Sequence, residues 1–333
     1  MKYCILLNLL FLTQPPDSLM VAFWNLENFF DPFIDTTRNY NEFTEEGSQH
    51  WTQSRFYRKR NNIYKAILAF SQNQPIGIMG VCEVENEFVL NAIFGLTPLK
   101  RFNYRWVHYE GPDHRGIDPA IVYSLDHFQL IHSEAIPYRN RDNPEMISRD
   151  ILYAKFFDGR NDTLHCFVNH WPSKYRGELE TETARHAAAA IVRHRVDSII
   201  AFVPEAKILI MGDFNDTPDA PCIRLVLGAK GVDELSLDSR LCNLFANNKD
   251  LGFKGTLKYQ ESWMVFDQIM VSNTMLDDVG LHCNPKDAHI VHLEELLIDD
   301  PTYYGKKLNR TYVGPQYYGG FSDHLPVVLL LRY

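Results

Sequence analysis

The strongest constraint on the fold of this sequence is a series of short apolar segments spread along its whole length. Each is long enough for a buried strand and too short for a buried helix. Two longer segments, 55–70 and 181–202, carry apolar residues three and four positions apart, as amphipathic helices do. We therefore expect helices over these two ranges and strands at 19–24, 76–84, 117–123, 151–157, 164–170, 207–211, 264–271 and 325–331.

The expected strands and helices do not alternate strictly. This favours an α/β fold with two packed sheets covered by helices over a single parallel sheet. No linker, repeat or low-complexity segment interrupts residues 19–333, so we expect them to form one domain. The sequence contains no G-x-G-x-x-G, G-x-x-x-x-G-K-[ST], G-x-S-x-G or H-E-x-x-H motif. Dinucleotide-binding, P-loop, α/β-hydrolase and zinc-peptidase functions are thereby excluded.

The composition is that of a globular protein with an acidic balance. Hydrophobic residues make up 45% and charged residues 23%, which excludes disorder, collagen and coiled coil. Lys and Arg number 33 against 42 Asp and Glu, a net charge of −9. A chain of this sign does not hold nucleic acid through a general basic surface. A polyanionic substrate would have to be bound locally, by a metal ion or a few placed cations.

The amino terminus has the shape of a short export signal. Lys2 is followed by a mostly apolar stretch over residues 3–12, which is too short to span a bilayer. We expect residues 1–18 to be a signal peptide or N-terminal extension and the protein to be periplasmic or extracellular; the alternatives are a buried first strand and a cytoplasmic protein. Without Cys4, five cysteines remain, an odd number that argues against a complete disulfide framework. No other segment resembles a membrane span.

Polar residues follow several of the apolar segments directly. On a regular strand Asn25 and Glu27 would share a face, and an amide beside a carboxylate suits a hard cation. A plain surface turn is the alternative. Glu83 ends a deeply apolar run, where a carboxylate is costly unless it meets a cation or hydrogen-bond donors. We therefore take Glu83 as the better metal ligand, while Glu85 would suit the first turn of a following helix.

The later apolar segments end in a histidine or in acidic and amide residues. His170 precedes a loop with Lys174 and Arg176, and these three could contact a phosphate, although a lone histidine is more often structural. Asp213 and Asn215 follow another strand, with a polar turn as the alternative. Asp267 interrupts an apolar strand and so demands a partner.

An acid and an imidazole stand side by side just before the last strand. A carboxylate such as Asp323 next to His324 raises the basicity of the imidazole and fixes its tautomer, as in a general base. The sequence offers no nucleophilic serine or cysteine in a recognisable elbow. The chemistry predicted by the whole set is metal-assisted attack by an activated water.

Seven segments that contain these residues resemble the endonuclease/exonuclease/phosphatase family, the deoxyribonuclease I-like metal-dependent phosphoesterases. They are spread over residues 21–329, and the combination of GDFN with a terminal SDH is highly specific. By this resemblance the fold would be a four-layer α/β/β/α sandwich with one active site at the strand ends of both sheets. The segments are WNLENFFD, GVCEVEN, RGIDPAIVY, NHWPS, GDFND, FDQIMVS and GGFSDHLPVV.

The resemblance also implies a role for each matching residue. Glu83 would bind the metal, supported by Asn25 and Glu27, and Asp323 would assist either the metal or the histidine. Asp213 would orient the attacking water and Asn215 would contact the phosphate. His324 would be the general base or polarise the phosphate, and Asp267 would hold His170 against the phosphate. Arg115 and Asp118 lie where family members support the site and the substrate.

We therefore expect a Mg²⁺-dependent phosphoester hydrolase, in which Mn²⁺ could replace Mg²⁺. Among such enzymes, a nuclease-like phosphodiesterase is the leading hypothesis. A phosphomonoesterase, a phosphoinositide or sphingomyelin phosphoesterase and a catalytically silent binding module are the alternatives. Aromatic residues in the insert 31–60, including Trp51 and Tyr57, and in 303–320 could line a substrate pocket or pack as ordinary loops. We expect a monomer with a phosphoester substrate, nucleic acid among the candidates, and without an obligate protein partner.

Overall fold

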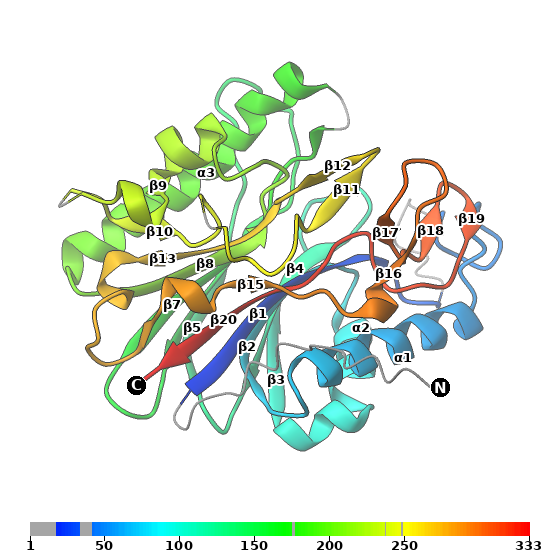
Figure 1. Ribbon diagram of the computed structural model, residues 1–333, viewed down its shortest axis with the longest axis horizontal. Helices are drawn as coiled ribbons and strands as arrows, with labels where there is room; N and C mark the ends of the chain where they lie inside the picture. The colour runs from blue at the N-terminus through cyan, green and yellow to red at the C-terminus, as the bar shows by residue number, and fades with distance from the viewer. Residues whose placement is uncertain (1–17, 34–41, 175–176, 237, 248) are drawn as a thin grey trace, which may run out of the picture.

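A computed structural model describes residues 18–33, 42–174, 177–236, 238–247 and 249–333. Two seven-stranded sheets lie face to face at its centre (Figure 1). The first sheet has the order β14 (His282–Cys283), β20 (Val327–Arg332), β1 (Ser18–Phe29), β2 (Ile76–Val84), β4 (Asp118–Ser124) and β3 (Tyr104–His108), with β15 (His289–Ile290) also on β20. The second has the order β5 (Gln129–Ile136), β6 (Ile151–Phe157), β7 (Thr163–His170), β8 (Lys207–Asp213), β13 (Asp267–Ser272), β10 (Leu241–Asn243) and β9 (Ala229–Lys230).

Helices cover the outer face of each sheet. The long helix α3 (Glu178–Phe202) packs on the second sheet, and α1 (Gln53–Phe70) packs on the first (Figure 1). The remaining helical elements are short: α2 (Glu87–Leu90), Asn91–Gly95, Pro98–Phe102, Cys222–Leu227, Val232–Glu234, Asn273–Met275, Pro285–Asp287 and Glu294–Leu296. The described residues also form three two-stranded hairpins: β11 (Leu257–Tyr259) with β12 (Ser262–Met264), β16 (Leu297–Asp299) with β17 (Lys306–Leu308), and β18 (Tyr312–Val313) with β19 (Gln316–Tyr317).

Alternating side chains on the strands build this layering. On β8, Ile208 and Ile210 belong to the core beneath α3, whereas Leu209 and Met211 belong to the core between the sheets. The sheets approach so closely that a β-carbon added at Gly80 on β2 would lie 2.9 Å from Met211 Sδ. Glycine is therefore required at that point of contact.

The strand directions bring one set of strand ends together. Strand β1 is parallel to β2 and antiparallel to β20, and β7 is parallel to β8, which is antiparallel to β13. The carboxyl ends of β1, β2, β7 and β8 therefore meet the amino ends of β4, β13 and β20. Several of the polar residues singled out in the sequence lie at this edge: Asn25, Glu83, His170, Asp213, Asp267 and His324.

All eight expected strands and both expected helices are present, so the predicted α/β fold of two mixed sheets with helices is confirmed. The bounds differ where polar motifs adjoin the strands. Strand β1 continues to Phe29, and β13 begins only at Asp267 because residues 262–264 turn back into the β11–β12 hairpin. Strands β3 and β5 were not predicted. Both are edge strands, and the largely solvent-accessible β5 lacks a continuous apolar run.

The insert 31–60 contributes side chains to the packed core. Trp51 is fully buried, its ring contacts Phe29 and Phe56, and its indole N–H donates to the Phe30 carbonyl. It is a core residue, whereas Tyr57 is 39% exposed.

The five cysteines in the part of the chain that the structure describes are buried free thiols, and Cys4 lies outside it. Among the described helices, none has the length and apolarity needed to cross a membrane. The expected signal segment also lies almost entirely outside the described residues.

A buried histidine on the outer face of the second sheet makes stability depend on pH. Burial lowers the pKa of His165 from 6.5 to about 4, and its Nδ1 lies 2.7 Å from the Tyr153 hydroxyl. His165 binds a proton at a higher pH in the unfolded chain than in the folded chain. Its contribution to the free energy of unfolding is therefore fully present above pH 6.5 and is lost as the pH falls toward 4.

We expect His165→Gln to lose less stability than the unmodified protein when the pH is lowered from neutral to about 4.5. With allowance for solvent screening, the difference should be about 1–2 kcal/mol. Urea unfolding at both pH values measures it. His194→Gln, on the exposed face of α3, is the matched control. An identical pH dependence of the His165 variant and the unmodified protein would contradict the assignment.

Candidate active site

Strained backbone marks the ends of the central strands. Glu27, Asn28, Glu83 and Asn215 all have positive φ angles, between 47° and 61°. Such angles are uncommon for residues other than glycine and cluster at functional sites. The register between β1 and β2 shifts between Asn25 and Phe29, which indicates a bulge within the first motif.

Three of the predicted residues meet through one amide. Asn25 Nδ2 lies 3.1 Å from Asp213 Oδ2 and 3.4 Å from Glu83 Oε1, so this amide joins carboxylates of the two sheets. Asn25 Oδ1 accepts the N–H of Glu27, which holds the amide nitrogen toward the carboxylates. The other oxygen of Glu83 accepts the N–H of Asn28 at 2.6 Å.

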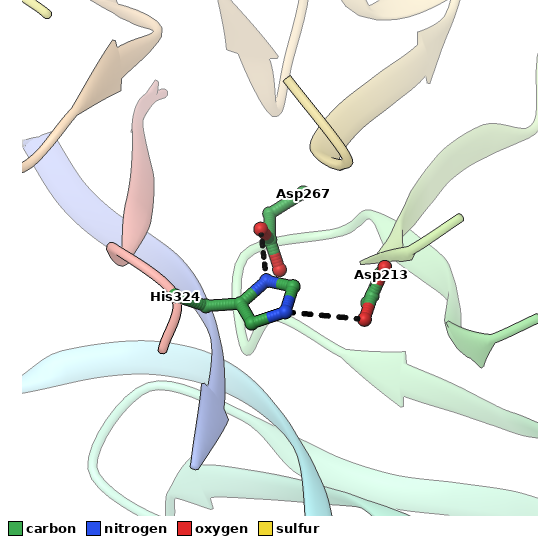
Figure 2. Close-up of side chains that lie close together, drawn as sticks. All are labelled: Asp213, Asp267 and His324. Atoms are coloured by element: carbon green, nitrogen blue, oxygen red, sulfur yellow. Dashed lines mark hydrogen bonds and ion pairs between the residues drawn. The ribbon is translucent and has the colours of Figure 1, made fainter. Parts of the chain in front are cut away.

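His324 lies between two aspartates of the opposite sheet (Figure 2). Its Nδ1 is 2.7 Å from Asp267 Oδ2, and its Nε2 is 3.7 Å from Asp213 Oδ2. The pairing of β8 with β13 places Asp213 directly opposite Asp267. The Ser322 hydroxyl accepts the N–H of His324, so the backbone of the histidine is fixed as well.

These carboxylates control the proton affinity of the histidine. Burial alone would lower the pKa of His324, but the charges of Asp267 and Asp213 outweigh it and raise the pKa well above its usual value. Burial also raises the pKa of Asp213, with a further contribution from Asp267 that the charge of His324 opposes. His324 is therefore protonated at neutral pH, with Asp267 and Asp213 as its counterions.

His170 is close to the same atoms, but its partners differ from those predicted. Its Nε2 is 3.7 Å from both Glu83 Oε1 and Asp213 Oδ2. The prediction that Asp267 holds His170 is wrong, because Asp267 binds His324 instead. Burial and the neighbouring positive charges of Arg149 and Arg115 lower the pKa of His170 well below its usual value. This histidine is neutral at neutral pH.

Asp323 and Glu27 form a second charged group around Arg310. Arg310 Nη2 is 2.9 Å from Asp323 Oδ2, and its Nε is 3.3 Å from Glu27 Oε1. Asp323 thus pairs with Arg310 and not with His324. The aspartate that orients His324 is Asp267. Although burial opposes it, the charge of Arg310 lowers the pKa of Asp323.

Glu27 does not share a face with Asn25, contrary to the prediction from strand alternation. Its positive φ angle of 50° breaks the alternation, and its carboxylate accepts the N–H groups of Thr311 and Tyr312. The Nε of Arg310 also donates to this carboxylate. The structure therefore places the Glu27 carboxylate behind the strand end, among backbone N–H groups and Arg310, and its predicted support of the metal together with Asn25 stays a prediction.

The remaining predicted residues lie at different distances from this centre. Asn215 donates its amide to the Trp171 carbonyl, and Arg115 donates to the Asn28 side chain. Asp118 accepts the N–H of Gly111. Lys174 pairs with Asp216 at 2.8 Å, which accounts for its position without a phosphate. Arg176 lies outside the described residues.

Sequence reasoning missed two buried or half-buried cations behind the site. Lys59 is 1% exposed, contacts the Glu27 carbonyl and donates to Thr311 Oγ1 at 2.7 Å. The sequence contained a sign of this buried lysine, because a lysine in the apolar stripe of Phe56 and Ile63 is unusual. Arg310 left no comparable signal, since it stands in a polar loop far from its partners in the sequence.

Residues 20–333 match the endonuclease/exonuclease/phosphatase family. The chain belongs to this family. One curated relative, Protein angel of Drosophila melanogaster, is 26% identical over 166 residues, which is 46% of this chain and 42% of that protein. The match thus spans less than half the length of this curated relative.

Solved structures of the family have the same fold. Humanized D. rerio TDP2 has a TM-score of 0.57 at 14% identity, and the match covers 95% of this chain and 99% of that one. A mannosyl-6-phosphatase of Bacteroides thetaiotaomicron VPI-5482 has a TM-score of 0.57 at 17% identity over 95% and 100% of the two chains. The human Nocturnin catalytic domain with bound sulfate has a TM-score of 0.54 at 15% identity over 95% and 96%.

The family is typically dependent on a divalent metal, and the donors at this edge fit a hard cation. Asp213, Asp267 and His324 have ligand atoms within 4.8 Å of one another, but the last two already bind each other. Glu83 reaches the surface with 13% of its side chain exposed. Among the residues that the structure describes, its Oε1 has only the long contacts to Asn25 and His170. Burial and a neighbouring carboxylate raise the pKa of Asp213, so a bound cation would relieve charge repulsion there.

Removal of Asp267 should uncouple His324 from its counterion. We expect Asp267→Asn to lower the pKa of His324 by about one to three pH units, since an adjacent opposite charge stabilises the imidazolium. NMR titration of the ring in metal-free protein measures this. Asp216→Asn, at a buried aspartate paired with Lys174 and Arg185, should leave the titration unchanged. Equal pKa values of His324 in the Asp267 variant and the unmodified protein would refute the pairing.

Lys59 should be important for stability. We expect Lys59→Met to reduce the free energy of unfolding by about 3 kcal/mol, because it leaves the buried Glu27 less compensated. Lys65→Met, at an exposed lysine of the same helix, should change it by less than about 0.5 kcal/mol. Urea unfolding compares the two. If both variants are as stable as the unmodified protein, Lys59 does not stabilise the charged group.

Proposed function

We propose that this family member is a divalent-metal-dependent phosphodiesterase of nuclease-like type. The observation that carries the proposal is the meeting of Asn25, Glu83 and Asp213 with two histidines at one edge of the two sheets. Burying these polar groups is costly for stability, which is understandable if they perform chemistry. A silent binding module would leave this cost unexplained.

Glu83 would hold the metal, with Asn25 keeping its carboxylate in place. Mg²⁺ or Mn²⁺ bound there would act as a Lewis acid toward a phosphoryl oxygen. Asp213, with a raised pKa, is suited to accept a proton from the attacking water. His324, protonated and held by Asp267, is suited to donate a hydrogen bond to a phosphate oxygen, which favours its phosphate-polarising role over that of general base.

The charge balance agrees with local rather than extended binding of a polyanion. Five of the carboxylates, Glu27, Glu83, Asp213, Asp267 and Asp323, belong to the site, and without them the formal charge of −9 becomes −4. The rest of the chain is then only mildly acidic. Tight, salt-sensitive wrapping of long nucleic acid is still disfavoured. Short or locally contacted phosphodiesters are the preferred substrates.

Purified protein should hydrolyse a phosphodiester reporter or plasmid DNA with Mg²⁺, and EDTA should stop the reaction. His324→Ala should lower kcat at least about a hundredfold, the usual scale of a placed proton-donating or proton-accepting group. His194→Ala, at an exposed histidine of the outer helix α3, is the control. A His324 variant with unchanged, metal-dependent activity would show that the histidine has another role.

A substrate panel separates the reactions open to this family. DNA, RNA, a phosphoinositide, sphingomyelin and a sugar phosphate are compared under the same metal conditions. Turnover of the lipids or the monoester, with both nucleic acids left intact, would replace the nuclease-like proposal by a phosphatase or lipid phosphoesterase. If Mg²⁺ binding is also absent by calorimetry and no ester is cleaved, the binding module is the better interpretation.

We also propose that the protein is exported to the periplasm or the cell exterior, on the basis of the first twelve residues. Amino-terminal sequencing of protein from separated cell fractions tests this. An intact Met1 in cytosolic protein would refute export.

A further inference from the structure

The pair of Asp267 and His324 joins two sheets that have no strand in common (Figure 2). Asp267 is the first residue of β13 in the second sheet, whereas His324 lies just before β20 in the first. Nδ1 of His324 is 2.7 Å from Asp267 Oδ2. A relative shift of the two sheets by about 1 Å would stretch this contact beyond hydrogen-bond distance. The pair therefore depends on how the two backbones are held relative to each other.

Thr256 contacts both backbones, although it belongs to neither of the two sheets. It lies directly before the β11–β12 hairpin and is fully buried. Its Oγ1 accepts the N–H groups of Phe266 and Asp267, each at 3.1 Å. Its carbonyl accepts the N–H of Leu325, the residue after His324, at 2.8 Å. One residue thus holds the backbones that carry both members of the pair.

The chain around Thr256 is itself fixed by close packing. Gly255 lies so near β12 that a β-carbon added there would be 2.7 Å from the Met264 carbonyl oxygen, so this position requires glycine. The N–H of Thr256 donates to the same oxygen at 2.8 Å. On β11, Lys258 pairs with Asp300 at 2.7 Å, and both side chains are largely buried. Thr256 is therefore a fixed point of contact between the two sheets.

The contacts of Thr256 extend to Asp213, the other aspartate that faces His324. The Phe266 carbonyl accepts the N–H of Phe214 at 3.0 Å, and Phe214 directly follows Asp213 in the sequence. The Thr256 hydroxyl binds the N–H of the same Phe266. The backbones of both aspartates are thus connected to this hydroxyl.

The other backbone contacts of His324 act on its own sheet. Trp24 on β1 donates its indole N–H to the His324 carbonyl at 2.9 Å, and the Ser322 hydroxyl accepts the N–H of His324. These two contacts hold the histidine against the first sheet, but they do not set its distance from Asp267. The contacts of Thr256 do, because they reach both sheets.

We propose that Thr256 is a positioning residue for the Asp267–His324 pair. The inference rests on the proposed function and deepens it, because a group that donates to a phosphate oxygen has to be held within about 0.5 Å of its productive position. Loss of the hydroxyl leaves two buried N–H groups without this acceptor and frees the start of β13 to move. A threonine that only stabilised the fold would leave kcat of the folded protein unchanged.

The test compares two substitutions of Thr256. Thr256→Val replaces the hydroxyl by a methyl group of similar size, and Thr256→Ser keeps the hydroxyl. We expect the valine variant to lower kcat for a phosphodiester reporter about tenfold, the equivalent of one lost buried hydrogen bond, and to change KM less than about twofold. The serine variant should keep kcat within about threefold of the unmodified protein.

Thr97→Val is the matched control. Thr97 is also buried, and its hydroxyl also accepts a backbone N–H, that of Leu99. It precedes the short helix Pro98–Phe102, which leads into β3 opposite the carboxyl end of β4. That end of the first sheet is away from the candidate active site. We expect this variant to keep the kcat of the unmodified protein.

The geometry of the pair is also measured without any activity. In metal-free protein with ¹⁵N-labelled histidine, the Nδ1 proton of His324 is protected by its hydrogen bond to Asp267. We expect Thr256→Val to increase the exchange of this proton with water at least about tenfold. Thr256→Ser and Thr97→Val should leave the exchange unchanged.

Unchanged exchange of the ring proton in Thr256→Val, or an equal loss of kcat in Thr97→Val, would overturn the proposal. If the unmodified protein hydrolyses no phosphoester, the proposed function fails, and the exchange of the ring proton alone decides the role of Thr256. If Thr256→Val does not fold, amide exchange in the unmodified protein decides it. Equal protection of the Asp267 and Leu325 amides would support the proposal, and much faster exchange at Leu325 would contradict it.

Discussion

The pairing of β8 with β13 controls the rest of the site, because it places Asp213 directly opposite Asp267 in a buried position. Two carboxylates so close together in a core repel each other unless a cation joins them. The other sheet supplies that cation as His324, just before β20. The interaction that would prepare the histidine for the proposed chemistry is therefore also an ionic contact between the two sheets. Sheet packing and the proposed catalysis depend on the same three side chains.

A second charged group, around Arg310, also joins carboxylates to a cation near the end of β1. Arg310 bridges Glu27 and Asp323, and Lys59 reaches the same segment from α1. Burial raises the pKa of Glu27 to about 7 and lowers the pKa of Lys59 to about 8, so the charged form of each carries a desolvation cost. Buried ion pairs are weak contributors to stability compared with apolar packing. Their presence beside the strand ends is better explained by the fixed position they impose on the first motif.

The sequence was sufficient for the fold and for the location of the site, but not for its pairings. Apolar runs mark strands because burial on both faces demands them, and the polar residues after them mark one edge. Strand alternation failed at Glu27, because a left-handed backbone turns its side chain away from Asn25. Adjacency in the sequence failed at Asp323, because His324 binds Asp267, 57 residues away. Such pairings depend on how two sheets face each other, which no local pattern contains.

The left-handed residues of the site have a consequence for how substitutions there are understood. Glu27, Asn28 and Glu83 keep φ angles near 50–60° because hydrogen bonds hold them: Thr311 and Tyr312 bind the carboxylate of Glu27, and Glu83 itself binds the N–H of Asn28. Such strain persists only while the surroundings enforce it. Replacing Glu83 therefore removes a carboxylate and also releases the backbone that positions Asn25. The proposed metal ligand and the backbone conformation that presents it are one structural unit, so neither contributes independently of the other.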